Sequence, residues 1–187
     1  PDAIDEQAKL IESLLTAHKL TVNHQRDKAG DRGSRVHDAL ETWAAMGTVP
    51  HPDDFSDEDR GYVQGLSDFL TTANIEPVAH EVMVGSSQHG YAGRFDLRAR
   101  ITAPSTVVGK CYPKKPPRMT TVPVGAGIFD LKTSAGVYET HPLQLEAYEA
   151  ASVECGYEPT NWRAILHVTA DGKYELVKSR AKFDHFL

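Results

Sequence analysis

The chain has 187 residues, of which 20 are Lys or Arg and 26 are Asp or Glu, so its formal net charge is −6. A chain of this length buries roughly 70% of the surface of its unfolded form, and we therefore expect one domain over residues 1–187. A hydrophobic content of 40% excludes collagen-like and wholly disordered chains. Two cysteines, Cys111 and Cys155, are too few for a disulfide framework or a four-cysteine zinc or iron–sulfur site.

Membrane insertion and secretion are not expected from the sequence. No segment approaches the roughly 18 consecutive apolar residues that a membrane-spanning helix needs. The first residues include Asp2, Asp5 and Glu6, where a secretory signal would be basic. We therefore expect a soluble, cytoplasmic protein. The negative charge usually disfavours a polyanionic partner, but carboxylates that bind divalent cations are also counted as negative charge.

Helical periodicity dominates the first part of the chain. Residues 4–19 place apolar side chains at three- and four-residue steps, which predicts a first helix. A polar stretch follows over 21–33, and Ser34 is expected to be the N-cap of a second helix. Residues 48–55 are expected to form a loop and 56–72 a third helix. The expected buried residues of the last two helices are Val36, Leu40, Trp43, Val63, Leu66, Phe69 and Leu70.

After Pro77 the periodicity becomes alternating, which predicts strands over 78–84 and 91–101 with a turn between them. In the second strand the period of two predicts a polar and an apolar face. The apolar face is expected to hold Phe95, Leu97, Ala99 and Ile101, and the polar face Arg94, Asp96, Arg98 and Arg100.

Residues 102–123 contain five prolines and are expected to form an irregular loop or a frayed hairpin extension. A third strand is expected over 124–133, with Phe129 and Leu131 pointing away from Asp130 and Lys132.

The last elements are a helix and a hairpin. Thr140 is the expected N-cap of a helix that runs to about Glu154 and ends at Gly156. Strands over 162–169 and 174–179 are joined by an Asp-Gly turn, a strong hairpin signal. This order of elements predicts an α+β fold with a mixed central sheet flanked by helices.

Asp96, Asp130 and Lys132 carry the most informative chemistry. Asp130 and Lys132 are two residues apart on one strand and so leave the same face of the sheet, where Asp96 joins them if the two strands are neighbours. Like charges at close range raise each other's pKa, and a divalent cation removes that conflict. Hard oxygen ligands favour Mg²⁺ or Mn²⁺, and Lys132 could orient or help deprotonate a metal-bound water for attack on phosphorus. By itself, a D-x-K triplet in a strand is most often a solvated, salt-bridged face.

Four motifs occur in order between Gly33 and Tyr148. They are G-x-x-x-H at 33–37, G-x-x-D at 93–96, I-F-D-L-K-T at 128–133 and Q-x-x-x-Y at 144–148. In this order and on these elements they resemble the PD-(D/E)xK nuclease superfamily and, within it, the RecB-like exonuclease domains. The resemblance implies a PD-(D/E)xK nuclease core with extra N-terminal helices, and a metal-dependent DNA exonuclease that uses Mg²⁺ or Mn²⁺.

The resemblance also implies roles for individual residues. Lys132 would be the catalytic lysine, and Gln144 and Tyr148 would contact DNA or the active site. The implied metal ligands are His37, Asp96, Asp130 and the Leu131 carbonyl, with Glu81 as an additional acidic ligand. Cysteines for the iron–sulfur cluster of related nucleases are absent. The implied setting is DNA recombination, replication or repair in a bacterial cell or phage-infected host cell, with a recombination or replication protein as a partner.

Several alternatives stay open at this point. His37 alone is more often a structural histidine, and Gln144 and Tyr148 could hydrogen-bond within the core. The long spacing between Asp96 and Asp130 makes 102–123 an insertion, expected near one edge of the cleft. Its basic cluster could be a solvated loop or a DNA contact, and consists of Lys110, Lys114, Lys115 and Arg118. The rival functions are a non-catalytic nucleic-acid- or partner-binding module on the same fold, and a sequence- or structure-specific endonuclease.

Overall fold

The computed structural model describes residues 2–19 and 21–187, with side chains described from residue 5 onward except residue 20. Within this part of the chain the helices are α1 (Asp2–Ala17), α2 (Val22–Met46), α3 (Asp57–Thr72) and α4 (Thr140–Glu154), with short 3₁₀ helices at Pro52–Asp54 and Phe183–His185. The strands are β1 (Ile75–Ser86), β2 (Tyr91–Ile101), β3 (Ser105–Tyr112), β4 (Lys115–Val122), β5 (Gly125–Lys132), β6 (Trp162–Val168) and β7 (Tyr174–Lys178).

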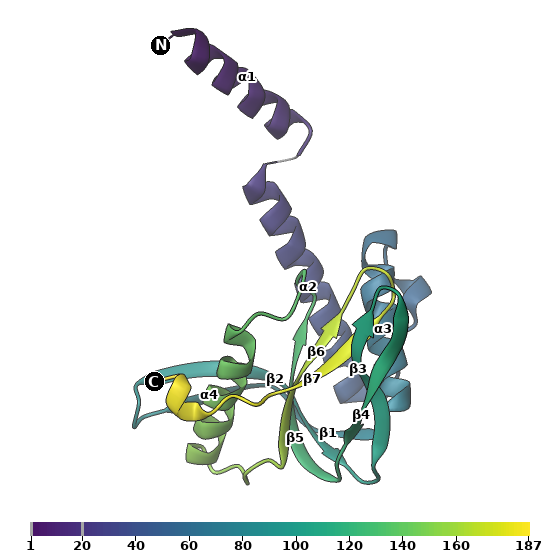
Figure 1. The fold of residues 1–187 in the computed structure, drawn as a ribbon. Helices are drawn as coiled ribbons and strands as arrows, with labels where there is room; N and C mark the ends of the chain where they lie inside the picture. Colours follow the sequence, from purple (N-terminus) through teal and green to yellow (C-terminus); the bar gives the residue numbers. More distant parts are fainter. Residues whose placement is uncertain (1, 20) are drawn as a thin grey trace.

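Five strands form a mixed sheet in the order β1-β2-β5-β6-β7 (Figure 1). All neighbouring pairs are antiparallel except β5 and β6, which run parallel and are connected through α4. Buried residues of α2 and α3 pack on one face of the sheet, and those of α4 pack on the other. The predicted α+β class with a mixed sheet flanked by helices is confirmed.

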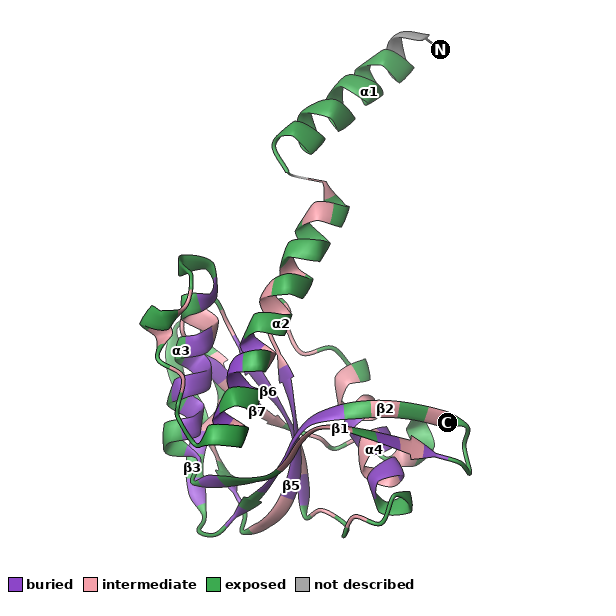
Figure 2. Cartoon of the chain, turned by 180° about the vertical axis from the view of Figure 1, so that it is seen from behind, coloured by how far each residue is buried: buried purple, intermediate pink, exposed green. Residues whose placement is uncertain are grey.

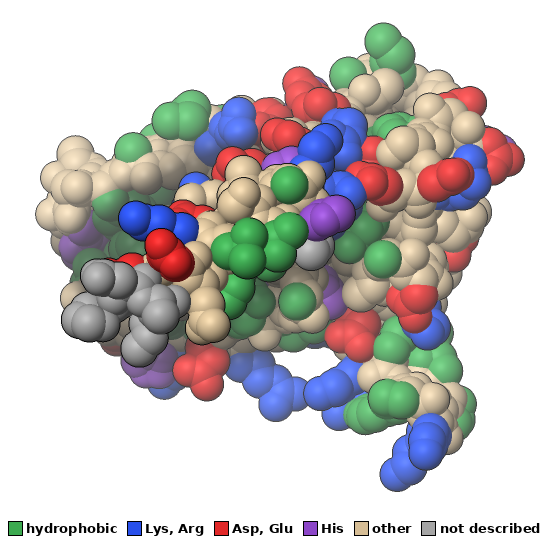
Figure 3. Space-filling view, turned by 90° about the horizontal axis from the view of Figure 1, so that it is seen from above, with side chains coloured by type: hydrophobic (Ala, Val, Ile, Leu, Met, Phe, Trp, Pro, Cys, Tyr) green, Lys and Arg blue, Asp and Glu red, His purple; other side chains and the backbone are tan. Residues whose placement is uncertain are grey.

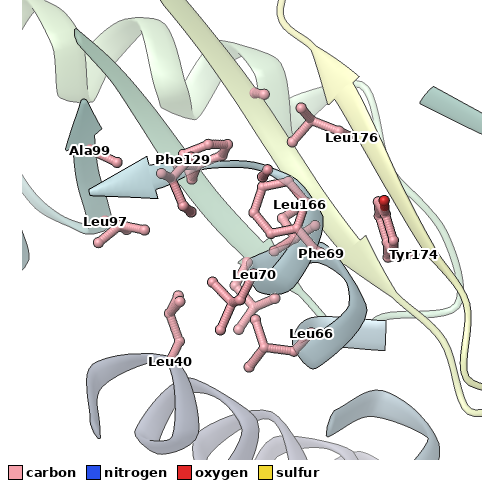
Figure 4. Packing of buried hydrophobic residues seen from close by; sticks show 14 of the residues in the cluster. Leu40, Leu66, Phe69, Leu70, Leu97, Ala99, Phe129, Leu166, Tyr174 and Leu176 are labelled. Carbon is pink, nitrogen blue, oxygen red and sulfur yellow. The ribbon is translucent and has the colours of Figure 1, made fainter. Parts of the chain in front are cut away.

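The larger part of the core lies between the sheet and the helices α2 and α3. Figure 4 shows the side chains of α3 and of the sheet strands meeting in this layer. Phe129 of β5 lies at the centre of this layer. Its ring meets the Phe69 ring edge-on with 5.4 Å between centroids, and the Trp162 ring with 4.5 Å between centroids. Such edge-to-face pairs add to the free energy of burying the rings.

The strand β2 does not keep the simple alternation that its sequence predicts. Leu97, Ala99 and Ile101 pack with α2 and α3, but Phe95 packs with the α4 side of the sheet. The expectation that Phe95 shares a face with Leu97 is therefore wrong. The change occurs at Asp96, where the ladder between β2 and β5 stops at the pair Leu97–Phe129.

The second helix begins thirteen residues earlier than the sequence predicts. Thr21 is its N-cap, and the Thr21 hydroxyl accepts a hydrogen bond from the His24 N–H. Ser34, the predicted N-cap, lies inside α2 and donates its hydroxyl to the Gly30 carbonyl. A smaller shift occurs at α4, where Glu139 is the cap residue and Thr140 is the first helical residue. The predicted helix over 4–19 is present as α1 (Asp2–Ala17), and its apolar side chains from residue 5 onward are exposed, Leu10 by 61% (Figure 2).

The proline-rich segment is more regular than an irregular loop. Residues 105–122 form the β3–β4 hairpin, with register shifts around Lys110. Val107 and Val122 are fully buried and join the main core, so the hairpin is anchored at its base. The hairpin alternative of the prediction is therefore the correct one. The predicted third helix, third strand and C-terminal hairpin are also confirmed, as α3, β5 and β6–β7.

We expect Gly127→Ala to lower stability, because a Cβ on Gly127 would lie 2.2 Å from ring atoms of Trp162. The indole is wedged against Phe129 and cannot move without opening the core. Overpacking of this kind costs about 1–3 kcal/mol, which urea unfolding would measure. The control is Gly136→Ala, because a Cβ there meets no atom within 4 Å. Equal unfolding midpoints for the two variants would contradict this account of the packing at Gly127.

Candidate active site

A cleft of about 540 Å³ lies between α2, the strands β1, β2 and β5, and Tyr148 of α4. One face of α2 lines it, since Gly30, Gly33, His37 and Glu41 follow one another at three- and four-residue steps. The adjacent face of the same helix is buried in the core through Val36, Ala39, Leu40 and Trp43. Core packing therefore fixes the rotation of α2 and turns His37 toward the sheet.

Glu81 and Asp96 enter the cleft from neighbouring strands. They lie in the gap of the β1–β2 ladder between the pairs His80–Leu97 and Val82–Phe95. Glu81 has a φ of 52°, a left-handed conformation that is costly for a residue with a Cβ. Strained residues of this kind are frequent at functional sites, and here the strain lies at a carboxylate that lines the cleft.

Asp96 is held by the backbone of β5. Its Oδ2 accepts a hydrogen bond of 2.7 Å from the Leu131 N–H, in a buried environment. The Leu131 side chain points the other way and is fully buried in the core. Asp96 thus has a fixed orientation, and its carboxylate is placed beside the strand that carries Asp130 and Lys132.

His37, Glu81 and Asp96 form a compact set of possible metal ligands. One ligand atom from each lies within 4.8 Å of the others. The His37 Nδ1 is 3.4 Å from Asp96 Oδ2 and 4.0 Å from Glu81 Oε1. Burial is the largest influence on the pKa of His37 and lowers it, but contact with Asp96 and the nearby carboxylates outweighs burial, so the pKa is raised. Burial and then the Asp96 charge raise the pKa of Glu81.

Asp130 is the most strongly perturbed carboxylate of the cleft. Its side chain is 3% exposed, and Asp130 Oδ2 lies 2.6 Å from Lys132 Nζ. No donor among the described residues meets this buried oxygen with hydrogen-bond geometry, so the contact with Lys132 is an ion pair with poor alignment. Burial, followed by the charge of Asp96, raises the pKa of Asp130 to about 6.

Tyr148 of α4 closes the cleft from the opposite side. Its ring packs so closely on β2 that a Cβ at Gly93 would lie 2.4 Å from Tyr148 Cε1, which explains the glycine three residues before Asp96. Burial and the charges of Asp130 and Asp96 raise the pKa of Tyr148 to about 12, so the phenol stays protonated. Gln144 is half-buried one turn earlier and touches Tyr148, and it is not part of the cleft lining.

The structure therefore brings together His37, Glu81, Asp96, Asp130, Lys132 and Tyr148. It does not bring the basic hairpin there. All four of its predicted DNA-binding residues are exposed, and none lines the cleft. The expectation that the insertion lies at an edge of the cleft is wrong, because β3 and β4 pack beside β7, at the other end of the sheet from β1.

Sequence reasoning assigned no role to Arg94 or Asp38, although both line the cleft. The Arg94 Nε is 2.8 Å from Glu81 Oε2 and neutralises that carboxylate. Arg94 precedes Asp96 by two residues on the same strand, so the alternation of side chains was a usable signal for it. Asp38 follows His37 on α2, and no comparable pattern marks it.

The donor set suits a hard divalent cation. Carboxylate oxygens with one imidazole are ligands for Mg²⁺ or Mn²⁺, and three such groups already converge in the cleft. The buried Asp130 oxygen without a hydrogen-bond donor is a further acceptor in the same cleft. These residues fit a metal on the chemistry of the donors and on the unsatisfied oxygen.

No protein-family model matches the chain, and no curated protein matches it either. Among the described helices, none combines the length and the apolar character needed to cross a bilayer.

Asp130→Asn should stabilise the metal-free protein at neutral pH. The pKa of Asp130 is raised from 3.8 to about 6 in the folded state, so the carboxyl contributes stability below pH 4 that is lost as pH rises through 6. Asparagine resembles the protonated form at every pH. In EDTA we expect the variant to exceed wild type by about 1–3 kcal/mol at pH 7.5 and to match it near pH 4. Urea unfolding at both pH values measures this, with exposed Asp184→Asn as the control; a pH-independent difference would contradict it.

Binding of Mn²⁺ should weaken steeply below pH 6. A cation competes with protons for His37 and Asp130, whose pKa values are both raised in the folded protein. At about 100 times its dissociation constant the cation should add roughly 2.7 kcal/mol, seen as a rise in melting temperature at pH 8 and little rise at pH 5. His37→Gln should reduce the rise, and His141→Gln, a half-buried histidine outside the ligand set, should not. An equal rise at both pH values would argue against these ligands.

Proposed function

We propose that the protein is a metal-dependent deoxyribonuclease of the PD-(D/E)xK type that hydrolyses DNA phosphodiester bonds as an exonuclease. The observation that carries the proposal is the convergence of His37, Asp96, Asp130 and Lys132, from three different elements, in one cleft. The four motifs that resemble the RecB-like domains supply these residues in the expected order. A solvated, salt-bridged strand face would not bury Asp130 to 2% exposure.

His37, Glu81, Asp96 and Asp130 would hold the cation. When bound, Mg²⁺ or Mn²⁺ supplies positive charge to the phosphate oxygens and lowers the pKa of coordinated water. Glu81 would be the ligand that most easily binds or leaves the cation, because Arg94 is already an alternative partner for its carboxylate. Asp96 would be the ligand with a fixed orientation, because the Leu131 N–H donates a hydrogen bond to its carboxylate.

Lys132 and Tyr148 would act on the reacting phosphate. Hydrolysis adds a water oxygen to phosphorus, breaks the bond to the leaving oxygen and returns a proton to that oxygen. Lys132 can donate a hydrogen bond to the nucleophile or to the phosphate, because its ammonium lies in the cleft 2.6 Å from Asp130. Tyr148 keeps its proton, so it is a hydrogen-bond donor for a phosphate oxygen on the far wall of the cleft.

Lys132→Ala should abolish most cleavage in a protein that still folds. The side chain faces the cleft and is 22% exposed, so its loss removes charge at the reacting phosphate and little packing. We expect turnover of end-labelled linear DNA in Mn²⁺ to fall by about 10²–10⁴-fold. Lys132→Met keeps most of the side-chain volume and separates loss of charge from loss of packing. Lys173→Ala on the exposed hairpin turn is the control, and wild-type cleavage by both Lys132 variants would overturn the assignment.

The exonuclease part of the proposal has its own test. An enzyme that needs an end leaves covalently closed circles intact and degrades the same DNA once it is linearised. We expect this pattern with Mg²⁺ or Mn²⁺ and no cleavage in EDTA. Rapid linearisation of the circles would favour the endonuclease alternative. Binding without cleavage in either metal would favour the non-catalytic module.

A further inference from the structure

A second groove, of about 510 Å³, lies between the β3–β4 hairpin and the segment that follows β7. Its charged lining consists of four cations and one anion, namely Lys110, Arg118, Lys178, Arg180 and Glu139. This excess of positive charge occurs in a chain whose net charge is −6. Figure 3 shows Lys and Arg side chains on both sides of an opening at the lower edge of the molecule.

The cations come from both walls of the groove. Lys110 and Arg118 are direct partners across the β3–β4 ladder, so their side chains share one face of the hairpin. Lys178 and Arg180 come from the end of β7 and the residues after it. Within the described part of the chain none of the four pairs with a carboxylate. Lys178 donates to the Thr121 carbonyl and keeps further donors, since an ammonium has three.

The floor between these cations is apolar. Leu176 is buried there, and Val177, Pro142 and Ala181 are half-buried. A row of cations beside an aliphatic floor can hold a single nucleic-acid strand, because the phosphates meet the charges and the faces of unpaired bases can lie on the floor. A duplex hides those faces and offers the groove only its backbone.

The groove and the cleft share helix α4. Pro142 lines the groove and Tyr148 lines the cleft, six residues or about 9 Å further along the helix axis. A strand held in the groove can therefore continue past the first turns of α4 toward the cleft.

We propose that this groove binds a single nucleic-acid strand and leads it to the cleft, so that the substrate is unpaired at the point of cleavage. The inference rests on the proposed nuclease function for the fate of the strand. Binding to the groove can be measured without it, in EDTA, where no cleavage occurs.

The decisive comparison uses two pairs on the same hairpin. Lys110→Gln with Arg118→Gln removes two charges from the groove, and Lys114→Gln with Lys115→Gln removes two exposed charges outside its lining. Both double variants have the same net charge, and Arg180→Gln probes the opposite wall. Melting temperatures of all three establish that they fold.

The probes are an oligothymidylate of about 20 nucleotides and a blunt duplex of the same length, titrated at several salt concentrations in EDTA. We expect wild type to bind the single strand at least about tenfold more tightly than the duplex. The groove pair should weaken single-strand binding about tenfold or more, and flatten the plot of log K against log salt by about 0.7 for each phosphate that the variant no longer neutralises. Arg180→Gln should act in the same direction, and the control pair should change little.

Equal losses of affinity in the two hairpin pairs, or equal wild-type affinity for single strand and duplex, would overturn the inference. Cleavage of bis(4-nitrophenyl) phosphate in Mn²⁺ separates this failure from that of the proposed function, because so small a diester cannot span from the cleft to the groove. If the groove pair cleaves it at the wild-type rate and loses strand binding, both proposals stand. If wild type binds the strand in the groove but cleaves no diester, the nuclease proposal fails and the binding site does not.

Discussion

The site depends on the point where β2 separates from β5. Their ladder runs from Ile101–Gly125 to Leu97–Phe129 and stops, and the next backbone donor, the Leu131 N–H, is bonded by the Asp96 carboxylate. Because a side chain replaces the missing ladder partner, this buried N–H stays paired when the strands diverge. The divergence sends Phe95 to the α4 side of the sheet and opens the space into which His37 and Lys132 point.

Each of the three carboxylates around this opening has its own partner, and one of these pairings is weak. Glu81 is paired with Arg94, and Asp96 is held by His37 together with a backbone N–H. Asp130 is the most buried of the three carboxylates, and its neighbour Lys132 is poorly aligned with it. Burial therefore acts most strongly on Asp130, whose pKa rises to about 6. A cation in the cleft would relieve this carboxylate most, so metal binding and stability would be coupled through it.

Local patterns in the sequence predicted the parts of the fold that depend on local physics. Alternation placed Asp130 and Lys132 on the face opposite Phe129, and the Asp-Gly turn located the last hairpin. The start of α2 could not be found this way, because residues 30–34 contain two glycines and favour no helix. Contacts with α3 keep this part helical, through the bidentate pair of Arg35 with Asp59 and the packing of Arg32 on the Tyr62 ring. The four site motifs are local patterns and were therefore visible in the sequence. The second groove was not, because Arg180 meets the hairpin only after the chain folds.

The separation of charge explains how an acidic protein can bind a polyanion. Carboxylates gather in the cleft around His37, where a phosphate is repelled until a cation is present, and four basic side chains without an ion pair line the groove beyond Pro142. The two sites therefore differ in what they require: the groove can attract phosphate in the absence of metal, and the cleft cannot. A strand would be captured first by charge in the groove and would enter the cleft only when a divalent cation has reversed the local field. This order would limit contact between the nucleic acid and the proposed catalytic groups to the metal-loaded protein.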